Sequence, residues 1–161
     1  MLVVEPDTES FRRVARALAD EGDGKELRRE LVANLKAIME PAAEEARANI
    51  MGMRSGGLPH AGEQLRSAVA AGVKTYVRTG HNPHVGIKAS KRGMPRGFVN
   101  APKRLNEAKG WRHKVFGRDV WVTQIGVPGW FDRPIQRRRK QYERAVQQAL
   151  ENVAKRIDRK A

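Results

Sequence analysis

The chain has 161 residues, and its 32 Lys and Arg against 18 Asp and Glu give it a formal net charge of +14. It contains no cysteine, which excludes disulfides, thiolate metal sites and a cysteine nucleophile. It has no run of about 18 apolar residues and no basic N-terminal stretch followed by an apolar one, so neither a membrane span nor a secretion signal is predicted.

The positive charge lies almost entirely in the second half of the chain. Residues 1–87 carry 12 Lys and Arg against 12 Asp and Glu, whereas residues 88–161 carry 20 against 6. A basic half indicates a polyanion or an acidic protein surface as a partner. The length is usual for one domain, so a single domain is predicted over residues 1–161.

Residues 1–52 are predicted to form helices. The apolar residues of a first helix recur at helical spacing and are Phe11, Val14 and Leu18. A second helix is predicted over residues 25–51, where Pro41 should kink it unless two shorter helices meet there. The apolar face of this second helix consists of Leu27, Leu31, Leu35, Ile38, Ala42, Ala46 and Ile50.

Residues 63–132 are predicted to hold a short helix and an antiparallel sheet of about four strands. The helix is expected over residues 63–71. Residues 73–78 and 84–89 alternate between apolar and polar side chains and should pair as a β-hairpin.

Two segments are predicted to be flexible assembly loops. Residues 53–62 are rich in glycine, and residues 90–110 are long, polar and basic, with one helical turn expected to begin at Pro102. The cations of the second loop that are predicted to contact a partner are Lys91, Arg92, Arg96, Lys103 and Arg104.

The segment from Gly110 to Asp132 contains all three tryptophans of the chain. Residues 119–125 are β-branched and aromatic, which predicts a strand, and residues 114–116 should pair back on it. The predicted core aromatic block consists of Trp111, Phe116, Trp121, Trp130 and Phe131. Replacing Trp121 with alanine would then cost about 3–5 kcal/mol, as truncations of large core side chains do.

Residues 133–160 are predicted to form the final helix, with Pro134 at a tolerated early position. Its core face consists of Ile135, Tyr142, Val146, Ala149 or Leu150, Val153 and Ile157. Its first turns carry four consecutive cations, which are Arg137, Arg138, Arg139 and Lys140. Cations at a helix N-terminus oppose the macrodipole, so these four are predicted to serve a partner.

The predicted fold class is therefore α+β. An antiparallel sheet of about four strands would be packed by a long N-terminal helix, kinked near Pro41, and by a long C-terminal helix.

The residues show no arrangement typical of catalysis or metal binding. His81 and His84 have no third ligand near them in the sequence, and catalytic zinc sites need three protein ligands. His113 is expected to be partly buried and hydrogen-bonded. No Ser/His/Asp order, phosphate-binding glycine loop or paired carboxylates occur. The chain is predicted not to be an enzyme, with no metal and no cofactor.

The basic segments fit nonspecific contact with nucleic-acid phosphates, because such contact needs only positive charge. No helix-turn-helix, zinc finger or RNA-binding motif is visible, so sequence-specific recognition is not predicted. A solvated basic face is an equally good interpretation of composition alone.

A family resemblance is recognisable over residues 102–131. The block Trp-Arg-His-Lys-Val-Phe-Gly at residues 111–117 is followed by Trp-Val-Thr-Gln at 121–124, Pro-Gly-Trp-Phe at 128–131 and a basic amphipathic helix. This order resembles the head–tail joining (tail-completion) proteins of long-tailed double-stranded DNA phages, in particular those of actinobacteria. The most specific part is the first block, where family members more often have proline at the position of Lys114.

The resemblance covers roughly residues 62–157 and includes a helix-then-strand opening at residues 64–78. It implies a structural virion protein without catalytic residues and with an α+β fold. Such proteins form a ring, typically six-fold, in the phage neck between the head connector and the tail-tube protein. Genome DNA passes through the ring. The protein would be made in the cytoplasm of a bacterial host.

Three alternatives stay open at this point. One is a tail terminator, which caps the tail tube at the same position. Another is a nonspecific nucleic-acid-binding protein of a bacterial cell. The third, a small hydrolase, would require activity that depends on His81, His84 or His113.

Overall fold

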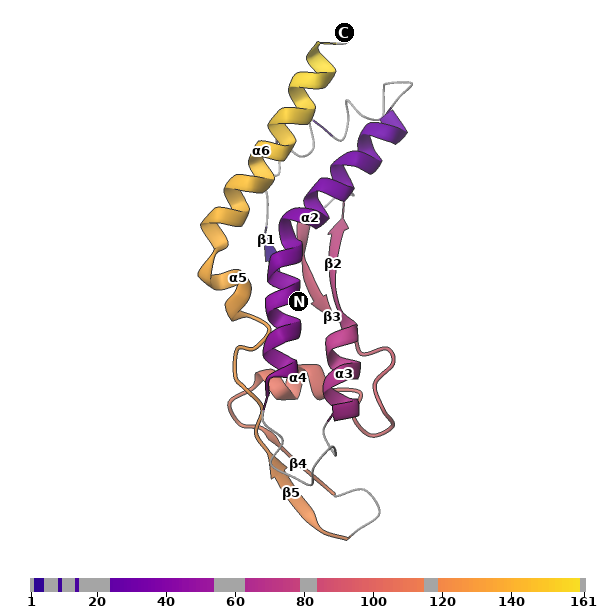
Figure 1. The fold of residues 1–161 in the computed structure, drawn as a ribbon, viewed down its shortest axis with the longest axis vertical. Helices are drawn as coiled ribbons and strands as arrows, with labels where there is room; N and C mark the ends of the chain where they lie inside the picture. The colour runs from indigo at the N-terminus through magenta and orange to yellow at the C-terminus, as the bar shows by residue number, and fades with distance from the viewer. Residues whose placement is uncertain are drawn as a thin grey trace. The chain divides into compact units, whose positions relative to one another are not determined.

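The structure, a computed structural model, describes residues 2–4, 9, 14, 24–53, 63–78, 84–114 and 119–159. Figure 1 shows the elements in order: β1 (Leu2–Val4), α2 (Gly24–Met51), α3 (Glu63–Gly72), β2 (Val73–Arg78), β3 (His84–Ala89), α4 (Ala101–Asn106), β4 (Trp111–Lys114), β5 (Trp121–Gln124), α5 (Arg133–Arg137) and α6 (Arg139–Asp158). This mixture of helix and strand, with a long helix near each end, confirms the α+β class.

The described strands lie in two separate sheets, so the prediction of one sheet of about four strands is wrong. In the first sheet β3 lies between β1 and β2, and β1 runs antiparallel to it with Leu2 opposite Ile87. The second sheet contains only β4 and β5, which pair antiparallel with Trp111 opposite Gln124.

The bounds of the individual strands were predicted better than the way in which the strands pair. β2 and β3 have the predicted bounds, and Figure 1 shows them side by side and running in opposite directions. β5 is shorter than the predicted 119–125, and its partner β4 begins earlier than the predicted 114–116. Lys114 pairs with Trp121, whereas residues 115 and 116 lie outside the described residues. β1 was not predicted, since three residues are too few to show an alternation.

Helix α2 is one continuous helix with Pro41 inside it, which rules out two shorter helices meeting there. Its predicted apolar face is buried except for Ile38, which is half-buried, and Met39 and Ala43 are buried with it. The predicted kink at Pro41 stays a prediction. The predicted first helix and its cap lie outside the described residues apart from Glu9, which is helical and exposed, and Val14, which is helical and buried. The glycine-rich loop lies outside them apart from Met53.

The predicted final helix is divided into two. α5 ends at Arg137, and Arg138 has φ −121° and ψ 20°, which are not helical values, before α6 begins. The four consecutive cations of residues 137–140 span this break, where repulsion between like charges and the helix macrodipole both disfavour a continuous helix. The predicted core face of α6 is confirmed, since Tyr142, Val146, Leu150, Val153 and Ile157 are buried.

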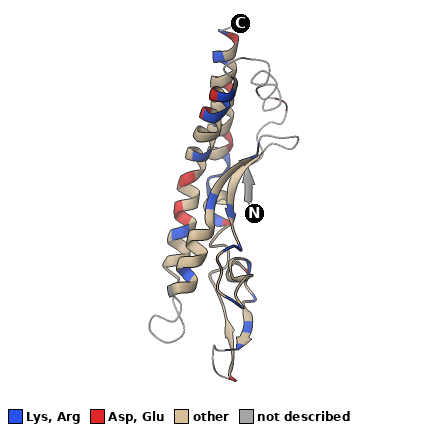
Figure 2. Cartoon of the chain, turned by 90° about the vertical axis from the view of Figure 1, so that its right-hand side faces the viewer, with Lys and Arg blue, Asp and Glu red and all other residues tan. Residues whose placement is uncertain are grey.

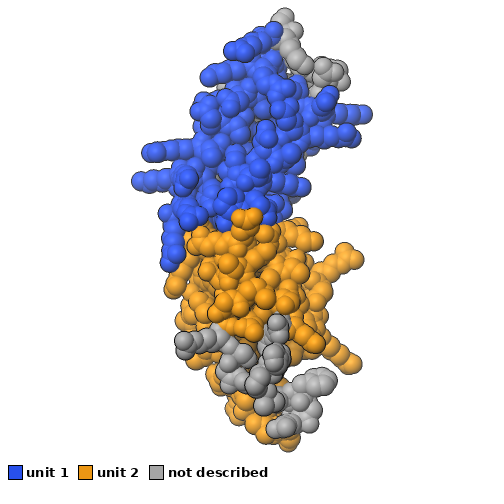
Figure 3. Space-filling model, in the orientation of Figure 1, with its two compact units in different colours: residues 1–42, 75–87, 135–161 blue, residues 43–74, 88–134 orange. Residues whose placement is uncertain are grey.

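The chain divides into two compact units, which Figure 3 shows in different colours. Unit 1 comprises residues 1–42, 75–87 and 135–161, and unit 2 comprises residues 43–74 and 88–134. Helices α2 and α5 and strands β2 and β3 each contribute residues to both units. The single domain therefore stays a prediction.

Unit 1 is built from most of the first sheet, all of α6 and the N-terminal part of α2. Its apolar core combines Leu31 and Leu35 of α2, Ile87 of β3 and the buried face of α6. An ion pair between Arg156 Nη1 and Glu30 Oε1, 2.6 Å long, joins α6 to α2 at the surface. Such exposed pairs stabilise a fold by less than about 1 kcal/mol, so the apolar core is what holds unit 1 together.

Unit 2 contains α3, α4 and the β4–β5 hairpin. Its close packing is visible at Gly72, where a Cβ atom would lie 2.9 Å from the carbonyl oxygen of Ser90. The amide of Ser90 also donates to the carbonyl of Gly72 over 2.9 Å, which fixes the end of α3 to the start of the basic loop. Among the described residues, no helix is both long and apolar enough to cross a membrane.

Candidate assembly surface

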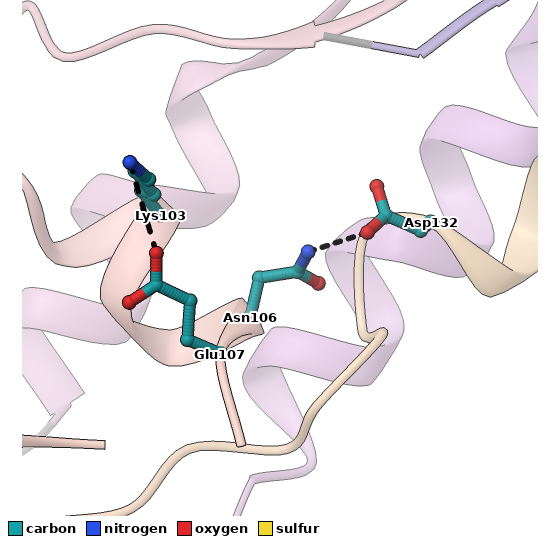
Figure 4. Close-up of polar contacts among 4 residues, drawn as sticks. All are labelled: Lys103, Asn106, Glu107 and Asp132. Atoms are coloured by element: carbon teal, nitrogen blue, oxygen red, sulfur yellow. Dashed lines mark hydrogen bonds and ion pairs between the residues drawn. The ribbon is translucent and has the colours of Figure 1, made fainter. Parts of the chain in front are cut away.

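Asn106, at the end of α4, fastens the segment that leads from β5 to α5. Its side-chain nitrogen donates to Asp132 Oδ2 over 2.6 Å, as Figure 4 shows, and its side-chain oxygen accepts from the backbone amide of Phe131 over 3.2 Å. Its own carbonyl accepts from the amide of Gly129 over 3.3 Å. The side chain and the backbone carbonyl of this one residue together tie both ends of a turn to α4.

The same turn places two large aromatic residues in the core of unit 2. Trp130 and Phe131 are buried, with ring centroids 5.4 Å apart in an edge-to-face arrangement. The side chain of Asn49 on α2 donates to the carbonyl of Trp130 over 3.1 Å. The prediction that Trp111, Trp130 and Phe131 are core residues is confirmed, whereas Phe116 lies outside the described residues.

One side of the β4–β5 hairpin is packed. Trp111 is buried at the start of β4, and His113 beside it has a ring centroid 5.3 Å from that of Phe98. His113 Nε2 also lies 3.1 Å from Oε1 of Gln124, so the histidine is held by β5 as well. The prediction that His113 is partly buried and hydrogen-bonded is thus confirmed.

The other side of the hairpin is exposed and both cationic and apolar. We call it the hairpin face, which consists of Arg112, Lys114, Trp121 and Thr123 with the following Ile125. The guanidinium carbon of Arg112 lies 5.3 Å from the centroid of the Trp121 ring, and Lys114 Nζ lies 5.6 Å from it. Both distances are within the range of cation–π attraction.

The prediction that Trp121 belongs to the protomer core is therefore wrong, because 51% of this residue is exposed. Strand alternation places Trp121 on the same side of the hairpin as Thr123 and its cross-strand partner Lys114. The buried Trp111 lies on the other side. A sheet of only two strands buries one side here. An aromatic residue can occur on either side of a strand, so the residue type alone does not predict that Trp121 lies on the exposed side.

Exposed apolar residues gather in unit 2. Six large hydrophobic residues are exposed among the described residues, and all six belong to this unit. They are Met51, Val99, Val120, Trp121, Ile125 and Val127. Four of them lie within residues 120–127, on or beside the hairpin face. Contiguous exposed apolar residues of this kind mark interaction surfaces.

The predicted contact cations fall into both units. Lys91, Arg92, Arg96 and Lys103 are exposed and Arg104 is half-buried, all in unit 2, where Figure 2 shows cationic segments along the loop and the hairpin. Lys103 already lies 3.8 Å from Glu107 as an ion pair. The cations at 137–140 are all exposed, and the structure places them around the α5–α6 break.

Part of this second group is engaged within the chain. Arg139 Nε donates to Glu143 Oε1 over 2.8 Å, and Arg137 and Arg138 also have interaction partners. An exposed pair of this kind exchanges easily for a contact with another molecule, because its net stabilisation is less than about 1 kcal/mol.

The histidines that suggested a metal site are packing residues where the structure describes them. His84 is buried, and its ring lies edge-on to Tyr76 with centroids 5.4 Å apart. Burial raises the pKa of Tyr76 above its ordinary value of 10.0, and the charge of Arg78 offsets part of that rise. His81 lies outside the described residues, within which no group of three potential ligands occurs.

A small pocket of about 130 Å³ lies in unit 2 beside the packed side of the hairpin. Its lining includes Phe98, Arg104 and Trp111. This volume holds a single side chain, well below the range of about 300–1,000 Å³ typical of small-molecule sites. The pocket is therefore better suited to a protein contact than to a metabolite.

Comparison of the chain with protein-family models, with curated proteins and with solved structures found no match.

A substitution at Asn106 tests whether its hydrogen bonds stabilise the turn before α5. Replacing Asn106 with alanine is expected to lower the free energy of unfolding by about 1–3 kcal/mol, because it removes two hydrogen bonds and leaves Asp132 and the Phe131 amide unsatisfied. The matched control is Asn100→Ala, since Asn100 is exposed and its side chain makes no capping hydrogen bond to α4. Urea titrations that gave equal losses for both variants would contradict this account.

The hairpin face contains residues that sequence reasoning missed, above all Arg112, Lys114 and Ile125. A signal was present, since Arg112 and Lys114 alternate with Trp111 and His113 and so define a charged side of β4. The missing information was the register, because only the pairing of Lys114 with Trp121 puts the tryptophan on that charged side.

Proposed function

We propose that this chain is a structural protein of a phage neck, where copies of it form a ring that joins the head connector to the tail tube. The proposal is supported by the positions of two sequence blocks of the family resemblance, those that begin at Trp111 and Trp121. Residues 111–114 and 121–124 form β4 and β5, which pair residue for residue. The resemblance thus coincides with one structural piece, whose exposed side has the Trp, Arg and aliphatic residues typical of protein contacts.

In this role the packed side of the hairpin anchors it in unit 2, and the charged segments make the contacts. We assign contact with neighbouring rings or with phosphates of the passing genome to Lys91, Arg92, Arg96, Lys103, Arg104 and Arg137–Lys140. The partners would be further copies in a hexamer, the head-connector protein, the tail-tube protein and nonspecifically bound DNA. No catalytic residue or cofactor is needed for such a role.

The proposal is tested by the mass and the location of the assembled protein. A ring should have a multiple of the 18.1 kDa chain mass, with six copies expected, in native mass spectrometry. Electron microscopy of tubes assembled from the tail-tube protein should show the ring at one tube end only. A protein that forms no ring alone or on tubes would contradict the proposal.

Nonspecific nucleic-acid binding is a second candidate, because the exposed cations of unit 2 favour it. A monomer that binds duplex DNA with a steep salt dependence, and that never associates with tail tubes, would support this reading in place of the first. A ring that binds DNA weakly fits the neck role. A tail terminator would also form a ring at a tube end, and interruption of tube growth by the purified protein would identify it.

A further inference from the structure

The hairpin face has the composition of a protein contact site. Trp121 and Ile125 are 51% and 65% exposed, and the cations of Arg112 and Lys114 flank the indole. Trp and Arg are the residues that most often dominate protein interfaces. Burying this face against a partner would remove a large apolar area from water.

DNA is a poor occupant of this face. Phosphates attract the cations but make no favourable contact with the exposed aliphatic side chains of Ile125 and the nearby Val127, which would stay in water on a nucleic-acid backbone. Stacking of a base on Trp121 would compete with Arg112 and Lys114 for the ring. The occupant that satisfies both kinds of residue is a protein surface with an acidic group beside small or apolar side chains.

This chain itself carries such a surface on α2. Glu44, Ala48 and Met51 are exposed at spacings of four and three residues, so they form one stripe on the side opposite the buried Ala43 and Ala46. We call these three residues the α2 stripe. Among the described residues, Glu44 makes no hydrogen bond or ion pair, and Met51 is 42% exposed.

We propose that the hairpin face of one copy docks on the α2 stripe of the next copy. Arg112 would pair with Glu44, and Trp121 would lie over Ala48, where a small side chain leaves room for an indole. Lys114 is already engaged within its own hairpin, since its Nζ donates to Asp119 Oδ1 over 2.5 Å. Met51 would contact the aliphatic residues that flank the hairpin face. The contact joins two different surfaces, so each copy can bind two neighbours, as a closed ring requires. The inference rests on the proposed function, because it names the contact between the copies of that ring.

The absence of cysteine from the chain allows a direct test by disulfide trapping. Copies with Ala48→Cys are mixed with copies with Thr123→Cys, which lies on the hairpin face, and are oxidised in solution and on tail tubes. We expect a crosslinked dimer from the mixture. A chain with both substitutions should give a ladder that ends at the ring size. The matched control replaces Thr123→Cys with Gln148→Cys, at an exposed position of α6 in unit 1.

The expected crosslink yield with Thr123→Cys is at least about tenfold above that of the control. The control cysteine lies outside the proposed contact, so it meets the Ala48→Cys thiol of another copy only in random collisions. A yield equal to the control, both in solution and on tubes, overturns the inference. If rings form on tubes without the ladder, the inference fails and the proposed function stands. A ladder from a protein that never joins tail tubes leaves the inference standing and refutes the proposed function.

Charge reversal tests the pairing independently. Arg112→Glu and Glu44→Arg should each raise the Kd of self-association about tenfold or more, because each places like charges opposite one another. An equimolar mixture of the two variants should associate again, since every contact between unlike copies then joins opposite charges. Sedimentation velocity measures both effects. A mixture that associates no better than either variant alone overturns the pairing.

Discussion

Replacing Trp130 with alanine is expected to lower the free energy of unfolding by about 3–5 kcal/mol, whereas the same replacement at Trp121 should cost less than about 1 kcal/mol. Trp130 is 1% exposed and packs edge-on against Phe131, so its loss leaves a cavity in unit 2. Trp121 is 51% exposed, so its truncation leaves no enclosed cavity and removes the cation–π contacts with Arg112 and Lys114.

The two variants control for each other, because both remove the same side chain from the same unit. Urea denaturation followed by circular dichroism measures both losses, and equal slopes would show that the variants unfold to similar states. If the free energy of unfolding fell as much for Trp121→Ala as for Trp130→Ala, Trp121 would have to be a core residue. The Trp121→Ala variant should instead fold normally and fail in self-association.

Replacing Gly126 with alanine is expected to cost at least about 3 kcal/mol, the upper range for overpacking a close contact. A Cβ atom there would lie 2.2 Å from the carbonyl oxygen of Leu105 and 2.5 Å from its Cα. These are backbone atoms of α4, so they cannot rotate away as a flexible side chain would. Either α4 or the segment after β5 must move, and the turn held by Asn106 moves with it.

Gly93→Ala is the control for Gly126→Ala. Gly93 has φ +84°, and no atom lies within 4 Å of the Cβ that alanine would add. Its cost should be limited to the left-handed backbone conformation, about 1–2 kcal/mol. Equal midpoints in urea for the two variants would mean that the contact between Gly126 and Leu105 is not close in solution.

The candidate assembly surface was predictable in part. The cationic loop was visible as a run of Lys and Arg, and α4 as a helical turn at Pro102, because both are local features. The hairpin face was not, since its members come from two strands and become one surface only through pairing. The α2 stripe was also hidden, because Glu44 among other helix charges has no local feature that separates an unpaired acid from a paired one.

By itself, the sequence determined the two long helices and the strands β2, β3 and β5, along with most of the buried residues of α2 and α6. These follow from the spacing of apolar side chains, which acts over a few residues and has the same meaning wherever the element lies. Only the tertiary structure decided that the strands form two sheets, since alternation along a strand does not specify which strand pairs with it.

The tertiary structure likewise decided the position of Trp121. Alternation along a strand defines two sides, but which side is buried depends on what other parts of the chain cover it. Phe98 packs on the side of His113. On the other side, the neighbours of the Trp121 ring among the described residues include the cations of Arg112 and Lys114. Of the three tryptophans that the sequence pattern assigned to the core, Trp121 is therefore the one that is exposed.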